Sequence, residues 1–222
     1  LFFETAEAKK RKPFLWHKEN GKYRSRTYRT AMQEVIHLAR GLRDLGIEPG
    51  DRVVICAENR PEWAIADIAI MALGAIAVPA YTTNTTTDHL HILSNSGAKG
   101  AIVSTRDLAK KLLPAAIDSG VCQFITSIEP LLIRQKLPLD VHAYDAVIAH
   151  GKELTDDIVA DARALPREST SCIIYTSGTG GTPKGVELSH GAILCNATGA
   201  FDVLSDGWSV GEEVFLSFLP MT

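Results

Sequence analysis

The amino-acid sequence predicts an α/β fold with mostly parallel sheets flanked by helices. Short, continuous apolar runs of the kind that buried parallel strands need recur along the chain. Between them lie longer segments whose apolar residues follow helical spacing, and glycine, proline and aspartate mark the turns. Because this alternation repeats, we expect helices to cover both faces of a mostly parallel sheet.

The first expected helix runs from Thr30 to Leu45, where apolar residues recur at helical spacing. Thr30 and Gln33 match the capping-box pattern at its start, and Gly46 ends it. After a turn, the apolar run Val53–Cys56 predicts a buried strand. A βα unit is therefore expected to begin at this strand.

The rest of the chain continues the alternation of apolar runs and helical segments. Further helices are expected over Glu62–Leu73, Thr87–Ser94, Leu108–Ile117 and Ala192–Ala200, the last with Ser189 as its start signal, and further strands over Ala75–Val78, Ala101–Ser104, Val121–Thr126, Cys172–Tyr175 and Val214–Leu219.

A polar, proline-containing connection at Leu165–Ser169 predicts a boundary within the chain. On this interpretation residues 1–165 form an N-terminal α/β subdomain. Residues 166–222 then carry a glycine-rich loop and begin the next subdomain.

Composition limits the classes of function. The 222 residues are 45% hydrophobic, which is enough for a sizeable core. A formal charge of −3 gives no basic field for a nucleic-acid backbone, so no nucleic-acid partner is expected. Four dispersed cysteines form no CxxC pair or disulfide framework, which favours a reducing cytoplasm. Neither a signal peptide nor a stretch of membrane-spanning length is recognised.

Four basic residues gather near the start of the sequence, at Lys9–Lys12. A solvated terminal segment is the favoured interpretation, because four charges without an apolar face bind lipid weakly. The alternative is peripheral contact with an anionic lipid surface at the inner face of a membrane, which would suit an enzyme that takes fatty acids from membranes.

The chemistry concentrates in the loop Tyr175–Gly185, which follows an apolar run. Its glycines let backbone N–H groups approach an anion, its hydroxyls add donors and Lys184 adds a positive charge. The alternative without a function is a flexible surface loop, but that interpretation does not account for this density of hydrogen-bond donors. The candidate phosphate-binding residues are Thr176, Ser177, Gly178, Thr179, Gly180, Gly181, Thr182 and Lys184.

Two common phosphate loops do not fit this stretch. A Walker-type loop needs Ser or Thr after its Lys, whereas Gly185 follows Lys184. A dinucleotide fingerprint counted from Gly178 would need glycine where Pro183 stands. The stretch therefore matches neither of these two classes.

Residues 175–186 read YTSGTGGTPKGV, which is similar to the signature YTSGTTGxPKGV of the adenylate-forming superfamily. That superfamily comprises acyl-CoA and aryl-CoA synthetases, luciferases and peptide-synthetase adenylation domains. The one departure is Gly180, where the family usually has Thr, so one hydroxyl donor is missing.

The resemblance extends over the whole chain and implies the N-terminal part of the adenylate-forming enzyme fold. The ending VFLSFLPMT is similar to the strand before a family histidine in long-chain acyl-CoA synthetases. Other stretches that look like the family's N-terminal region are Thr27–Tyr28, GIEPGDRVV at 46–54, NRPEW at 59–63, GAIAVP at 74–79 and SGAK at 96–99.

The resemblance implies an AMP-forming acid–thiol ligase that uses ATP and Mg²⁺, with CoA as co-substrate. A carboxylic acid, expected to be a long-chain fatty acid, would form acyl-AMP and then acyl-CoA. The loop would hold the β- and γ-phosphates, and Thr179 would reach the metal. The family's adenine-contacting motif, acidic metal ligand, ribose-binding Asp and catalytic Lys fall after residue 222, so this chain alone is expected to be inactive and no catalytic residue is assigned within it.

Three other functions stay open at this point: another adenylate-forming enzyme, a kinase, and a non-catalytic nucleotide-binding or scaffold module. A kinase would produce ADP, whereas adenylation produces AMP and pyrophosphate. Several other polar residues are considered as candidate site residues, and no functional role is assigned to them. His89 and His91 form an HxH pair without a third metal ligand, His190 follows the loop, and Asp156, Asp157 and Asp161 are interpreted as surface charge.

Overall fold

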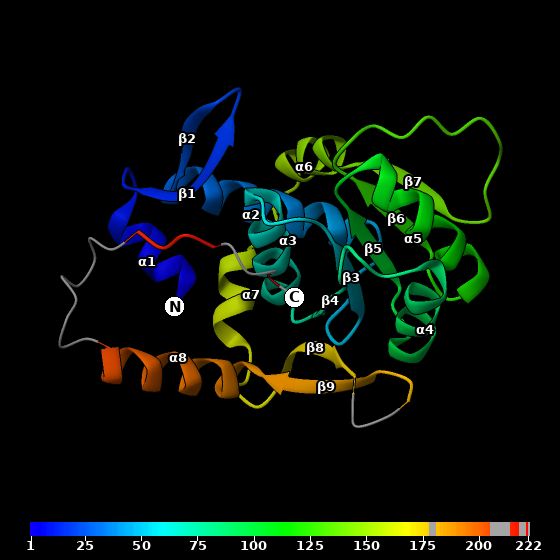
Figure 1. Ribbon diagram of the computed structural model, residues 1–222. Helices are drawn as coiled ribbons and strands as arrows, with labels where there is room; N and C mark the ends of the chain where they lie inside the picture. The colour runs from blue at the N-terminus through cyan, green and yellow to red at the C-terminus, as the bar shows by residue number, and fades with distance from the viewer. Residues whose placement is uncertain (178–180, 205–213, 218–220, 222) are drawn as a thin grey trace.

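The computed structural model describes residues 1–177, 181–204, 214–217 and 221. A seven-stranded sheet forms its centre, and a helix with a two-stranded hairpin lies at the N-terminal end (Figure 1). The N-terminal part consists of helix α1 (Phe2–Lys9) and the antiparallel strands β1 (Pro13–Glu19) and β2 (Lys22–Thr27).

The large sheet has the strand order β7-β6-β5-β3-β4-β8-β9, and every neighbouring pair is parallel except β8 and β9. The predicted α/β class with a mostly parallel sheet is confirmed. The strands are β3 (Arg52–Cys56), β4 (Ile76–Pro79), β5 (Gly100–Val103), β6 (Phe124–Ser127), β7 (Asp140–Ala143), β8 (Thr170–Thr176) and β9 (Lys184–Ser189).

Helices lie on both faces of this sheet, as predicted (Figure 1). On one face are α2 (Tyr28–Asp44), α3 (Pro61–Ala72), α6 (Tyr144–Glu153) and α7 (Ile158–Ala164), and on the other are α4 (Thr86–Ser96) and α5 (Arg106–Ser119). Helix α8 (His190–Leu204) follows β9 and extends away from the sheet, and none of its described residues joins either core (Figure 1).

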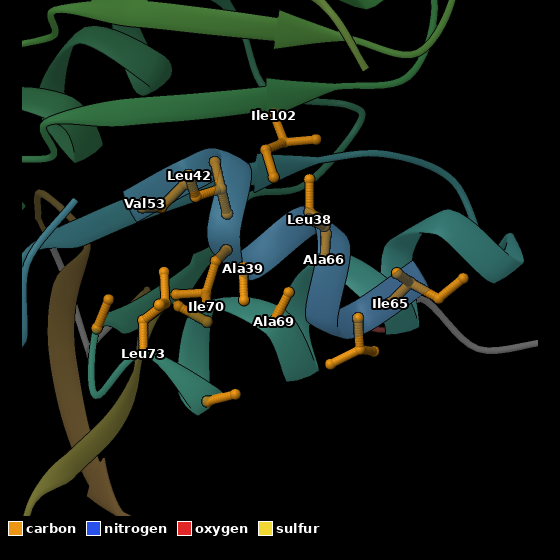
Figure 2. Close-up of a cluster of buried hydrophobic side chains, with 14 of the residues drawn as sticks. Leu38, Ala39, Leu42, Val53, Ile65, Ala66, Ala69, Ile70, Leu73 and Ile102 are labelled. Carbon is orange, nitrogen blue, oxygen red and sulfur yellow. The ribbon is translucent and has the colours of Figure 1, made fainter. Parts of the chain in front are cut away.

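Alternate residues of each inner strand enter two separate cores. Val53 and Ile55 pack with α2, α3 and α6, whereas Val54 and Cys56 pack with α4 and α5. Both faces are buried, which is why these strands read as continuous apolar runs rather than alternating ones. Figure 2 shows the first core, in which Leu38, Ala39 and Leu42 of α2 meet Ile65, Ala66, Ala69 and Ile70 of α3 beside Leu73, Val53 and Ile102.

The start of α2 differs from the prediction. Thr27, in an extended backbone conformation, is the N-cap, and its Oγ1 accepts a hydrogen bond from the Thr30 N–H at 3.2 Å. Thr30 therefore lies inside the helix, and the predicted capping box of Thr30 and Gln33 is wrong. The hydroxyl that caps a helix must sit before the first helical residue, and Thr27 occupies that position.

Two predicted strands need correction. The strand expected over Val121–Thr126 begins only at Phe124, because Gly120 ends α5 in the left-handed conformation with a φ of 65° and residues 121–123 belong to neither helix nor strand. Val214–Ser217, expected to begin a strand, pairs with no strand in the part of the chain that the structure describes. Ser217 instead accepts a hydrogen bond from the Asn59 amide. Residues 218 and 219 of this predicted strand lie outside the described residues.

The other predicted helices and strands are confirmed, with ends that shift by a few residues. The predicted start of α8 also holds, since Ser189 Oγ accepts from the Ala192 N–H at 3.1 Å. The elements that no sequence pattern predicted are α1, β1, β2, β7, α6 and β9.

The acidic residues before β8 lie at the surface, as predicted, and each has a partner there. Arg43 on α2 forms ion pairs with Asp156 at 3.3 Å and Asp161 at 2.7 Å. Asp157 caps α7 by accepting from the Ala160 N–H. The acidic group therefore attaches α7 to α2, a role that depends on a cation far away in the sequence.

Strand β8 joins the same sheet as the preceding strands, next to β4. The division into subdomains at residues 165 and 166 stays a prediction. In the described part of the chain, no helix is both long and apolar enough to span a membrane.

Candidate functional site

The glycine-rich loop connects the two antiparallel strands β8 and β9. The last residue of β8, Thr176, pairs with the first residue of β9, Lys184, so this pair closes the base of the loop. The connection therefore starts at Ser177 and ends at Pro183. A short loop closed by a ladder of backbone hydrogen bonds has a fixed entry and a fixed exit.

The described candidate residues lie on the surface around this base. Thr176, Ser177, Gly181, Thr182 and Lys184 are all exposed. The other three candidates, Gly178, Thr179 and Gly180, lie outside the described residues. The assignment of Thr179 to Mg²⁺ therefore stays a prediction.

The polar groups at the loop are available for a ligand. The side-chain hydroxyls of Thr176, Ser177 and Thr182 form no hydrogen bond within the part of the chain that the structure describes, and the Lys184 ammonium forms no ion pair there. Gly181 has a φ of 128°, which side-chain-bearing residues rarely adopt. Hydroxyl donors, an ammonium and a backbone of this kind suit the binding of an oxyanion such as phosphate.

Gly185 serves the packing beneath the loop. A Cβ at this position would lie 2.7 Å from Cγ2 of Ile173 and 3.2 Å from Cζ of Tyr175. The Tyr175 ring, which is 6% exposed, fills that space, and its burial raises the pKa of the phenol. Gly185, predicted to be one of the anion-binding glycines of the loop, is thus needed to make room for a buried aromatic side chain.

Helix α4 contacts both ends of the loop. His91 Nε2 lies 2.8 Å from the Pro183 carbonyl oxygen at the exit, and the Tyr175 hydroxyl donates to Asn95 Oδ1 at 2.7 Å just before the entry. The His91 and Tyr175 rings meet edge to face at 5.8 Å. The sequence pattern singled out His91 only as part of an HxH pair, so its contact with the loop was not predicted. The i, i+4 spacing of His91 and Asn95 was the available signal, since it places two polar side chains on one helix face.

The HxH pair does not act together, because residues two apart on a helix point to different sides. His89 is fully buried in the second core, and its Nε2 lies 3.9 Å from Cys56 Sγ. Its burial lowers the pKa of the imidazole to about 4. Among the residues that the structure describes, no three His, Cys, Asp or Glu side chains gather in a group that could hold a metal ion.

His190 starts α8 and stands apart from the loop chemistry. Its burial lowers the pKa of the imidazole, and its Nε2 is buried without a hydrogen-bond partner among the described residues. Its backbone N–H donates to the Ser169 carbonyl at 3.1 Å. The described contacts give His190 a place in the packing at the start of α8.

A groove of about 950 Å³ lies at the N-terminal hairpin. None of the described candidate phosphate-binding residues lines it. Its walls come from β1, β2, the start of α3 and the segment Val214–Ser217. Because it lacks the loop's donors, the groove does not define the nucleotide site.

Comparison with known proteins agrees with this geometry. The chain matches the family described as AMP-binding enzyme over residues 2–222. Long chain acyl-CoA synthetase 1 of Arabidopsis thaliana is 31% identical over 217 residues, which cover 90% of this chain and 31% of that protein. The long-chain-fatty-acid–CoA ligase FadD15 of Mycobacterium tuberculosis is 33% identical over 192 residues, covering 86% of this chain and 30% of the ligase.

A solved structure shares the fold. The A-PCP didomain of the carboxylic acid reductase from Segniliparus rugosus, determined in complex with AMP, superposes with a TM-score of 0.73 at 21% identity. The match covers 88% of this chain and 33% of that chain. The present chain thus spans about a third of the length of the proteins it matches.

Proposed function

Because the chain belongs to the AMP-binding enzyme family, we propose that the protein containing it is an AMP-forming ligase that activates a carboxylic acid with ATP. The acid's carboxylate attacks the α-phosphorus, which gives acyl-AMP and releases pyrophosphate. The thiol of CoA then displaces AMP to give acyl-CoA. One relative is named a long chain acyl-CoA synthetase and another a long-chain-fatty-acid–CoA ligase, which supports a long-chain fatty acid as the substrate.

The observation that carries the proposal is the loop whose base is closed by the pair Thr176 and Lys184. Its hydroxyls and ammonium have no competing partner among the described residues, so they are free to bind the β- and γ-phosphates. Donors held in advance of the reaction stabilise charge that develops on the departing pyrophosphate. The loop therefore acts by positioning and electrostatics, not by forming a covalent bond.

Mg²⁺ is part of the proposal. This ion prefers oxygen ligands and is usually held by a few protein oxygens together with substrate phosphates. The hydroxyl oxygens of the loop are of that type, and Thr179 is the proposed ligand. When bound, the ion neutralises charge on the phosphates.

The direct test is exchange of labelled pyrophosphate into ATP by the full-length protein, with a panel of fatty acids. Acid-dependent exchange, with AMP as the nucleotide product, is the expected result. Production of ADP would indicate a kinase instead. Binding of ATP without exchange or hydrolysis would indicate a non-catalytic nucleotide-binding module.

We also propose that the protein functions in a reducing cytoplasm. Cys195 is exposed and unpaired, as is usual where thiols stay reduced.

The N-terminal basic residues support peripheral contact with a membrane. Lys10, Arg11 and Lys12 are exposed beside the hairpin, where Trp16 is 49% exposed. Basic residues near an exposed aromatic ring suit an anionic lipid surface. Cosedimentation with phosphatidylserine vesicles, but not with phosphatidylcholine vesicles, is the expected outcome.

A further inference from the structure

We propose that His91 and Asn95 on α4 are positioning residues that fix the two ends of the phosphate-binding loop. Neither residue belongs to the glycine-rich stretch, and neither is assigned a contact with substrate. The inference rests on the proposed function, because it assumes that the loop binds ATP phosphates. It adds a structural support on another element, 92 residues before the loop's exit.

At the exit, His91 controls one peptide group. The Pro183 carbonyl can only accept a hydrogen bond, so His91 Nε2, at 2.8 Å, must carry the proton and donate it. That carbonyl belongs to the peptide group whose nitrogen is the amide of Lys184. The hydrogen bond therefore fixes the orientation of the peptide plane between Pro183 and Lys184, and with it the direction in which the Lys184 side chain leaves the backbone.

At the entry, Asn95 acts through Tyr175. The Tyr175 hydroxyl donates to Asn95 Oδ1 at 2.7 Å, and Tyr175 directly precedes Thr176, the first candidate donor. The His91 ring meets the ring of the same tyrosine in a T-shaped arrangement, at an interplanar angle of 86°. The two supports thus share one buried aromatic ring and hold both ends of the loop at once.

Strand alternation explains why α4 reaches the loop. Ile173 and Tyr175 point to the face of the sheet covered by α4 and α5, and they join the second core with Ile92 and Leu93 of α4. One helical turn separates His91 from Asn95, so both side chains lie over the strand end. Tyr175 is therefore the side chain of the sheet that connects α4 to the entry of the loop.

The helix itself is firmly held. Thr85 and Asp88 form a complete capping box at its start, and Gly97 ends it in the left-handed conformation with a φ of 62°. Ile92 and Leu93 are buried on its inner side. A rigid support matters because misplacing a binding group by about 1 Å can cost on the order of a hundredfold in rate.

The test compares four single variants of the full-length protein in pyrophosphate exchange. His91→Phe keeps an aromatic ring against Tyr175 but removes the donor, whereas His91→Gln keeps an N–H donor at about the position of Nε2. Asn95→Ala removes the acceptor for Tyr175. Ser94→Ala, on an exposed position of the same helix, is the matched control.

His91→Phe and Asn95→Ala should each raise the KM for ATP about three- to tenfold, the effect of losing one hydrogen bond. The KM for the fatty acid should stay within about twofold, and His91→Gln should restore most of the ATP affinity. Ser94→Ala should match the wild type. Hydrogen exchange at the Lys184 to Val186 amides should speed up in His91→Phe and not in His91→Gln, a readout that needs no turnover.

Two results would overturn the positioning role. One is a wild-type KM for ATP together with wild-type exchange at residues 184–186 in His91→Phe. The other is faster exchange over the whole sheet, which would show general destabilisation instead of a local effect. The variant Lys184→Ala distinguishes a wrong positioning role from a wrong proposed function. If Lys184→Ala lowers adenylation while His91→Phe does not, only the positioning role is wrong.

Discussion

Tyr175 lies directly across the β8–β9 ladder from Gly185, and its ring occupies the space that a side chain at residue 185 would need. The nearest atoms to a Cβ there are Ile173 Cγ2 at 2.7 Å and Tyr175 Cζ at 3.2 Å. The structure at the base of the loop therefore depends on the absence of a side chain at Gly185, which leaves room for the Tyr175 ring.

Gly185→Ala is expected to lower the free energy of unfolding by about 1–3 kcal/mol, because Ile173 and Tyr175 must move to admit the methyl group. Urea unfolding measures the effect. Gly199→Ala is the matched control, since a Cβ there meets nothing within 4 Å. In an exposed position of α8 this change should be neutral or stabilising by up to about 1 kcal/mol. Equal effects of the two substitutions would contradict the packing argument.

Lys184→Ala is expected to reduce pyrophosphate exchange about tenfold to a hundredfold. The reason is the loss of one charge-assisted contact worth about 1.5–3 kcal/mol. Lys136→Ala, at another exposed lysine, controls for the change in net charge and should have little effect. An unchanged rate with an unchanged KM for ATP in Lys184→Ala would remove the loop from the phosphate site.

Gly180→Thr supplies the hydroxyl that the family signature usually has at this position. A regained hydrogen bond of about 0.5–1.5 kcal/mol should lower the KM for ATP by about two- to tenfold. Steady-state kinetics at saturating fatty acid provide the measurement. A KM that stays the same or rises would show that no useful donor is missing.

His89 is expected to make the protein sensitive to acid. Burial, the largest cause, and Lys111 lower the pKa of His89 to about 4, against an opposing effect of Asp88. Between about pH 6.5 and pH 4 the unfolded chain binds the proton and the native state does not, so stability is lost as the pH falls through this window. The loss should be about 2–3 kcal/mol between pH 7.5 and pH 4.5.

His89→Met tests this expectation, because it replaces the imidazole with an apolar side chain of similar size. Urea unfolding at both pH values, for wild type and variant, gives the difference that belongs to this residue. The variant should lose less stability on acidification than the wild type. Parallel pH profiles would show that His89 titrates normally in the native state.

Local sequence patterns predicted most of the α/β framework. Val53–Cys56 and Cys172–Tyr175 were recognised as strands because both of their faces are buried, which leaves a continuous apolar run. Strand β9 was missed for the opposite reason. Its residues Lys184–Val186 are exposed, so no apolar run marks it, and only its pairing with β8 makes it a strand.

The sequence by itself determined the fold class and the stretch of donors around Lys184, because helical periodicity, apolar runs and loop composition are local properties. Only the tertiary structure decided what surrounds that stretch. Asp156 pairs with Arg43, which lies 113 residues earlier in the chain. His91 came to lie beside Pro183 because strand order and side-chain alternation brought α4 under the end of β8. Such contacts join segments far apart in the chain, and their energy depends on the packing of the whole sheet, which no local pattern encodes.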